Sequence, residues 1–199
     1  KYKNKKILVI GGGPSTKELL KGDYETVFNQ YDFLWSSNSF FLNSDLKNIK
    51  IDLAMMMLEP DLYSKEFVNY SNKFKPTIGF ELHDKWKKEN FQYDDLFMMQ
   101  TRFYGIIGVC QRMIIFANIL EANQIGFVGL DGLKSMKKGD HSFEKNKKTL
   151  PSITNEETFQ YQCDELWRYI NNNFKKSKIV NHGFDNPYHR GLKERLNEK

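Results

Sequence analysis

Short runs of apolar residues alternate along the chain with longer segments in which apolar residues recur every three or four positions. The first run, Ile7 to Ile10, has no polar alternation, so it indicates a central strand that is buried on both faces of a parallel sheet. Similar runs predict further strands at residues 31–38, 51–57, 77–80, 95–99, 124–131 and 178–181.

Helical spacing predicts helices over residues 15–21, 60–72, 104–122 and 154–174. The segment 104–122 is apolar around most of its circumference, which indicates a helix packed against the sheet. Strands and helices alternate throughout. We therefore predict an α/β fold, a Rossmann-like, doubly wound and mainly parallel sheet, in a single domain over residues 1–199.

The composition agrees with this prediction. The chain has 199 residues, of which 40% are apolar, and this suits one domain with a full core. It starts at Lys1 and shows no signal-peptide pattern, which is compatible with a domain excised from a longer protein. No run approaches the roughly 18 apolar residues of a membrane span. Two cysteines, Cys110 and Cys163, are too few to indicate a disulfide framework, so we predict a cytoplasmic location.

The formal net charge of +5 comes from lysines along the whole chain, with clusters at residues 134–148 and 175–178. Basic and aromatic residues do not alternate in these clusters, so we predict no nucleic-acid partner. Such clusters usually form a solvated face. The functional alternative is a weak attraction to anionic substrates or to a membrane surface, which would place the protein at the membrane periphery.

A turn of three glycines, a proline and a serine follows the first strand directly; we call Gly11 to Ser15 the glycine turn. Pro14 suits the first turn of a helix, and Ser15 with Glu18 matches a capping box, so the helix should begin close to Ser15. Backbone N–H groups at such a turn favour a bound phosphate, and Gly11, Gly12, Gly13, Pro14 and Ser15 are therefore candidate nucleotide-binding residues. The alternative is a tight turn that only joins strand and helix.

The spacing of the glycine turn excludes two common nucleotide sites. Thr16 takes the third glycine position of G-x-G-x-x-G, and residues 31–38 end in Asn38 rather than in an acidic residue, so no dinucleotide motif is present. No G-x-x-x-x-G-K-[ST] motif occurs either. Ligands of doubly wound sheets bind beyond the carboxyl ends of the strands. That rule places the following on one edge: the glycine turn, Asn38, Glu59, Asp131 and His182.

Four segments carry the motifs of this edge: I-G-G-G-P-S-T-K-E-L from residue 10, S-S-N-S-F-F-L at 36–42, G-I-I-G-V at 105–109 and F-V-G-L-D-G at 127–132. Together they resemble the bacterial lipooligosaccharide sialyltransferases, which carry G-N-G-P-S, C-N-Q-F-Y-F, T-S-G and G-I-D-F-Y in the same order. The resemblance covers about residues 6–145. It extends to a related group that includes archaeal pterin diphosphokinases and polysaccharide-biosynthesis proteins. It implies a Rossmann-like domain that binds a CMP-activated nine-carbon sugar and needs no metal.

The resemblance also implies roles for single residues. Asn38 matches the family's asparagine that contacts the nucleotide, and Asp131 matches its strand-end aspartate, so we expect both to bind the ribose or the cytosine of the nucleotide. A departing phosphate needs hydrogen-bond donors, and our candidates are the amides of Gly12, Gly13 and Ser15 and those at the helix start near Gly108. The Tyr104 hydroxyl is a further candidate donor, with packing as its alternative role.

The chain departs from the family's pattern at four places. Gly12 and Glu59 stand where the family has asparagines, and Ile106-Ile107 replaces its phosphate-binding Thr-Ser. Residues 151–157 lack its catalytic histidine.

Another residue must then assist the acceptor hydroxyl. We predict His141, in the lysine-rich loop, or Glu59 as this catalytic group. The alternative for His141 is an exposed side chain without a role. His182 borders the same edge, whereas we expect His83 and His189 at the surface.

The predicted activity is transfer of a CMP-activated sugar, sialic acid or a related ulosonic acid, to a glycan acceptor. No D-x-D motif occurs, so we expect neither a metal nor a cofactor besides the donor. Diphosphoryl transfer to a pterin-like alcohol is one alternative, but it needs Mg²⁺ and clustered carboxylates, and Asp94 and Asp95 should point apart on a strand. A non-catalytic nucleotide-binding domain of surface-polysaccharide assembly is the other.

Overall fold

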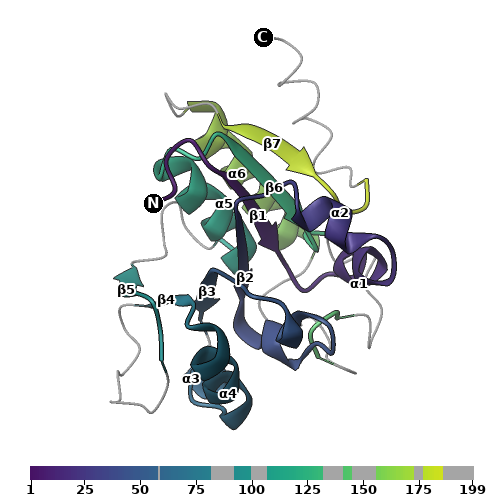
Figure 1. The fold of residues 1–199 in the computed structure, drawn as a ribbon. Coiled ribbons are helices and arrows are strands. Elements are labelled where there is room, and N and C mark those ends of the chain that lie inside the picture. Colours follow the sequence, from purple (N-terminus) through teal and green to yellow (C-terminus); the bar gives the residue numbers. More distant parts are fainter. Residues whose placement is uncertain are drawn as a thin grey trace.

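The computed structural model describes residues 1–57, 59–81, 92–99, 107–131, 141–144, 156–172 and 177–185. Within these residues, seven strands form one sheet in the order β5-β4-β3-β2-β1-β6-β7, and every neighbouring pair is parallel (Figure 1). The strands are β1 (Lys6–Ile10), β2 (Phe33–Ser37), β3 (Leu53–Met56), β4 (Thr77–Glu81), β5 (Leu96–Met99), β6 (Gln124–Val128) and β7 (Lys178–Asn181). The α/β Rossmann-like prediction is confirmed, and the sheet is wholly parallel in the part described.

Strand β1 lies between β2 and β6. Ile7 pairs with Phe33 on one side and with Ile125 on the other, and residues 7–10 are fully buried. A strand that is covered on both faces gains nothing from polar alternation, which explains its uninterrupted apolar run. The predicted central position of this strand is confirmed.

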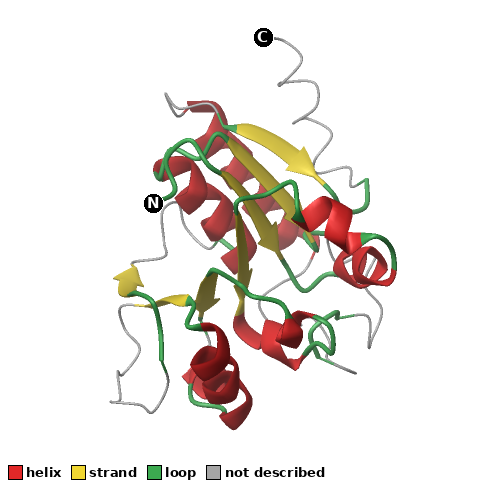
Figure 2. Ribbon diagram, in the orientation of Figure 1, coloured by secondary structure: helices red, strands yellow, loops and turns green. Residues whose placement is uncertain are grey.

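Helices cover both faces of the sheet (Figure 2). On one face, α5 (Val109–Ile119) and α6 (Glu156–Asn172) pack with Ile7, Val9 and Trp35 in one core. On the other face, Leu8 and Ile10 belong to a second core, with side chains from the remaining helices. These helices are α1 (Pro14–Lys21), α2 (Tyr24–Phe28), the 3₁₀ helices η1 (Asn38–Leu42) and η2 (Leu46–Asn48), α3 (Glu59–Leu62) and α4 (Lys65–Phe74).

One helix prediction needs correction, and one helix was not predicted. The helix predicted over 60–72 is broken into α3 and α4 at Ser64, whose hydroxyl accepts a hydrogen bond from the Phe67 amide and so caps α4. Helix α2 was not predicted, because it is only five residues long and carries little periodicity. The Asp23 side chain caps it by accepting from the Thr26 amide at 3.2 Å.

No helix in the described part of the chain combines the length and the apolar character that a membrane span requires. The single-domain prediction for residues 1–199, the cytoplasmic location and the membrane-peripheral alternative remain predictions.

Candidate functional site

The carboxyl ends of five strands carry the predicted site residues. Gly11 follows β1, Asn38 follows β2, α3 with Glu59 follows β3, Asp131 follows β6, and His182 follows β7. Since all strands are parallel, these positions share one edge, as predicted. The Glu59 side chain and the whole of Tyr104, His83 and His189 lie outside the described residues.

Two of the three glycines allow β1 and β6 to meet closely beyond the sheet. The Gly11 amide donates to Val128 O at 2.8 Å, and the Gly13 amide donates to Gly129 O at 3.0 Å. A Cβ atom on either glycine would lie 2.7 Å from that same carbonyl oxygen of Gly129. Gly129 has a φ of +76°, which favours glycine there too. Gly11 and Gly13 are therefore required for packing.

The Asp131 carboxylate occupies the N-terminus of α1. Its Oδ2 accepts from the Ser15 amide at 2.7 Å, and Asp131 is only 6% exposed. A carboxylate at a helix N-terminus is stabilised by the helix dipole and by the amide it accepts from. The Ser15 and Gly13 amides, which we predicted to hold a phosphate, thus donate within the protein. Asp131 thus caps α1, and its predicted contact with the nucleotide stays a prediction.

The predicted capping box is wrong. Helix α1 starts at Pro14, as that residue's fixed geometry suggests, and its N-cap is Gly13. Ser15 lies inside the helix, and its hydroxyl accepts from the Gly129 amide at 2.9 Å. Glu18 pairs with Lys21 instead. The caps of α1 come from distant segments, which local spacing cannot reveal.

Gly12 lies on the opposite side of the turn, against His141. A Cβ atom on Gly12 would overlap the imidazole of His141 at Nε2 and Cε1, so a glycine leaves the space that the ring uses. Gly12 is half-buried. No group among the described residues accepts a hydrogen bond from its amide. The structure thus brings together two residues that are 129 positions apart and that we had predicted to serve one site.

The tautomer of His141 follows from its neighbours. Its Nδ1 accepts from the Phe143 amide at 3.3 Å, so in the neutral ring the proton is on Nε2, the nitrogen beside Gly12. In this tautomer His141 offers the glycine turn a donor. The predicted role as a base for an acceptor hydroxyl would require the ring to change its hydrogen bonding.

Ser142 holds the His141 segment in place, and the sequence analysis missed it. Its hydroxyl donates to Gly13 O at 2.5 Å and accepts from the Lys17 amide at 3.1 Å, so it caps α1 as well. Its backbone amide donates to Gly12 O at 2.8 Å, and its carbonyl accepts from Asn43 Nδ2 at 2.7 Å. The pattern Asp-His-Ser in a polar loop gave no signal for this role.

Segment 141–144 also contacts η1. The buried Ser39 hydroxyl lies 2.6 Å from a carboxylate oxygen of Asp61 and 2.6 Å from one of Glu144. Asn38 adopts a left-handed φ of 50°, and its Oδ1 accepts from the Met57 amide at 2.8 Å. Its side-chain carbonyl therefore joins β2 to β3, while the nucleotide contact implied by the resemblance stays a prediction.

The start of α5 lies beside the glycine turn. Gly108 is the N-cap of α5, and two residues later Cys110 Sγ would be 2.7 Å from a Cβ atom on Gly11. Burial, together with the Asp131 charge, raises the pKa of the Cys110 thiol to about 12. A thiol with such a pKa is not a nucleophile near neutral pH. Phosphate binding by Gly108 remains a prediction.

His182 takes a different partner from His141. Its Nε2 lies 2.6 Å from the Tyr31 hydroxyl, which also accepts from Gln124 Nε2. The Tyr31 hydroxyl packs on Gly126, where any Cβ atom would overlap it. Burial lowers the pKa of His182, which favours the neutral ring. His182 is thus held by packing on the α2 side of β6.

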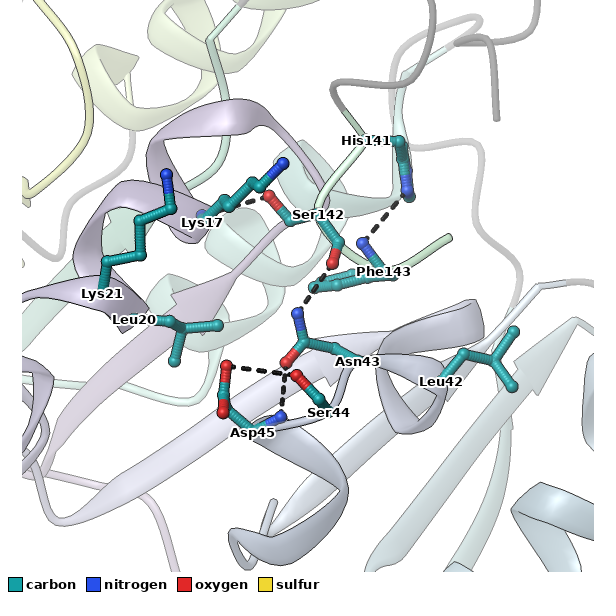
Figure 3. A pocket seen from close by; sticks show the side chains of 10 residues that line it. All are labelled: Lys17, Leu20, Lys21, Leu42, Asn43, Ser44, Asp45, His141, Ser142 and Phe143. Carbon is teal, nitrogen blue, oxygen red and sulfur yellow. Dashed lines mark hydrogen bonds between the residues drawn. The ribbon is translucent and has the colours of Figure 1, made fainter. Parts of the chain in front are cut away.

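An open pocket of about 470 Å³ is lined in part by His141 (Figure 3). Its walls come from α1, from residues 42–45 and from residues 141–143. Within the described ranges, no three His, Cys, Asp or Glu side chains are grouped so that they could hold a metal ion.

Comparisons with known proteins show similarity at the level of structure. No protein-family model matches the sequence, and no curated protein matches it. Among solved structures, the MAf glycosyltransferase from Magnetospirillum magneticum AMB-1 matches with a TM-score of 0.52 at 9% sequence identity. The match covers 100% of this chain and 37% of that protein, so this chain corresponds to little more than a third of its length. At this identity the likeness shows a shared fold.

Proposed function

We propose that this chain is a glycosyltransferase-like domain that binds a CMP-activated sugar, sialic acid or a related ulosonic acid, and transfers the sugar to a glycan acceptor without a metal. Two independent likenesses support the proposal. The motifs of the strand ends resemble the lipooligosaccharide sialyltransferases, and the whole chain overlays on part of a protein described as a glycosyltransferase.

The observation that carries the proposal is the contact of His141 with Gly12. A CMP-sugar reacts when the bond between the anomeric carbon and the phosphate oxygen breaks and CMP leaves with the electron pair. The acceptor oxygen then bonds to that carbon. Donors beside the phosphate stabilise its developing charge. The Gly12 amide, which has no acceptor among the described residues, and the Nε2–H of His141 beside Gly12 are two such donors.

The phosphate should therefore bind at Gly12 rather than at the start of α1. There the Asp131 carboxylate already accepts from Ser15, and it would repel a second anion. The proton of the acceptor hydroxyl needs a base. Glu59 at the start of α3 is our candidate from the sequence, since His141 presents its protonated nitrogen to the turn.

Asp131 also favours a second candidate function. A helix N-terminus that is capped by a carboxylate from its own chain resembles a phosphate site that is no longer used. On that view the chain is a non-catalytic accessory domain of surface-polysaccharide assembly.

The test is titration calorimetry with CMP, UMP, AMP and NAD, followed by a turnover assay with CMP-sugars. We expect the unmodified protein to prefer CMP. We expect about a tenfold loss of CMP affinity in His141→Ala, because the substitution removes one hydrogen-bond donor to the phosphate. His182→Gln is the matched control, because its ring contacts Tyr31, and it should bind CMP like the unmodified protein.

No preference for CMP would refute the proposed donor. Preferential CMP binding without turnover of any CMP-sugar would instead support the accessory domain. With turnover, we expect His141→Ala to lower the rate by about 10²-fold or more, the usual contribution of one preorganised hydrogen-bond donor to the developing charge.

A further inference from the structure

The pocket beside His141 has walls that are fixed by the fold. Asn43 ties one wall to the next: its Nδ2 donates to Ser142 O at 2.7 Å, and its Oδ1 accepts from the amides of Asp45 and Leu46. Ser142 in turn is linked to α1, because its hydroxyl accepts a hydrogen bond from the Lys17 amide. Such a pocket is largely formed before a ligand arrives, and its volume of about 470 Å³ matches a small-molecule site.

Positive charge dominates the α1 wall. Lys17 and Lys21 extend from α1 on one side, and Asp45 stands on the facing wall (Figure 3). Lys21 pairs with Glu18 at 2.9 Å. The Lys17 ammonium has no hydrogen-bond or ion-pair partner among the described residues. An unpaired cation at the rim of a pocket favours an anionic ligand.

The other lining groups suit a carbohydrate. Leu42 keeps 44% of its surface exposed at the rim and is the apolar surface that the C–H face of a sugar ring can cover, whereas Leu20 and Phe143 line the pocket as nearly buried side chains. The Ser44 hydroxyl and the Asp45 carboxylate stand beside them as partners for sugar hydroxyls.

We infer that this pocket binds the glycan acceptor through an acidic sugar residue whose carboxylate pairs with Lys17. The role of this saccharide as an acceptor rests on the proposed function, whereas the binding of an acidic saccharide rests on the pocket alone. The placement is consistent with transfer, because His141 borders both Gly12 and the pocket and would separate donor phosphate from acceptor by one side chain.

The experiment is an NMR titration of the ¹⁵N-labelled chain with a disaccharide that ends in glucuronic acid. The neutral disaccharide that ends in glucose and inorganic phosphate serve as comparison ligands. We expect the acidic disaccharide to shift the amide signals of Leu20, Ser44 and Ser142. We expect Lys17→Ala to weaken binding of the acidic disaccharide about twofold to fivefold, as the loss of one exposed ion pair should. Lys65→Ala removes an exposed lysine outside the pocket and should leave affinity unchanged.

Equal binding of the acidic and neutral disaccharides, or an unchanged affinity in Lys17→Ala, would overturn the inference. Phosphate that shifts the same signals at equal or higher affinity would also overturn it, because the pocket would then be a general anion site. CMP titration of the same sample separates the two proposals. Acidic-saccharide binding at the pocket without CMP binding would refute the proposed donor and the acceptor role, while it would confirm the saccharide site.

Discussion

The two sides of the glycine turn differ in how their polar groups are used. Toward β6, the amides of Gly11, Gly13 and Ser15 all donate to atoms of the chain, and Asp131 fills the space at the start of α1. On the side of η1, His141 packs against Gly12 and borders an open pocket, and the Gly12 amide has no acceptor in the part of the chain that is described.

This difference separates two uses of glycine in five consecutive residues. On the β6 side a missing side chain allows two backbones to approach. On the η1 side a missing side chain leaves room for an imidazole. A glycine-rich turn therefore indicates close approach, and only the fold shows whether the approaching group belongs to the protein or to a ligand.

Alanine substitutions at Gly13 and at Gly12 test the difference between the two sides of the turn most directly. A Cβ on Gly13 meets the Gly129 carbonyl and the Asp131 carboxylate, which cannot move without opening β1 from β6, so we expect a loss of about 3 kcal/mol in the free energy of unfolding. A Cβ on Gly12 meets only a side chain that can turn away, so we expect less than about 1 kcal/mol. Urea denaturation of both variants measures this. Equal losses would contradict the distinction.

Replacement of Asp131 should give the next largest effect. Asp131→Ala leaves the buried Ser15 amide without its acceptor, which we expect to cost about 2 kcal/mol of stability. Asp131→Asn keeps an acceptor oxygen and should cost less. The same variant also tests binding: a higher CMP affinity in Asp131→Asn would show that the negative charge of Asp131 keeps phosphate away from the start of α1. Calorimetry and urea denaturation on the same samples give both values. An unchanged stability in Asp131→Ala would show that the cap is not important.

Ser142 links the two sides, and its removal should have a moderate effect. Ser142→Ala deletes the bonds to Gly13 O and from the Lys17 amide, for an expected loss of about 1 kcal/mol. Because the same segment carries His141, CMP affinity should fall as well. Ser44→Ala, on the exposed wall of the pocket, is the control and should leave the unfolding midpoint unchanged. The link between the segment and α1 is disproved if both variants unfold alike.

The smallest effect concerns His182 and acid. Its pKa in the folded chain lies below the ordinary histidine value of 6.5, so the unfolded chain binds more protons as the pH falls below that value. The contribution of this residue to the free energy of unfolding is fully present above pH 6.5 and is lost as the pH falls through the lower pKa of the folded chain. Thermal unfolding at about pH 7.5 and about pH 5.5 should show a smaller acid-induced decrease in His182→Gln than in the unmodified protein. Identical decreases would mean that other groups carry this pH dependence.

Much of the fold could be predicted because buried parallel strands have a strong local signal. The uninterrupted run at residues 7–10 identified the central strand, and each further apolar run became a strand. Helix α2 and the break at Ser64 were missed, since five residues carry little periodicity and a serine inside a polar helix looks unremarkable in a sequence. The predicted capping box does not form because Ser15 bonds to residues far along the chain: its amide donates to Asp131, and its hydroxyl accepts from the Gly129 amide.

From the sequence alone we could predict the order of strands and helices along the chain, the position of the glycine turn after a central strand, and the set of residues that parallel strands bring to one edge. Those features depend on local hydrophobicity and on the direction of the strands. The packed fold was needed to show that Asp131 caps α1, that Gly12 makes room for His141, and that Ser142 joins them beside a pocket. These contacts join residues more than a hundred positions apart, so their geometry depends on the packing of the whole sheet edge rather than on any local pattern.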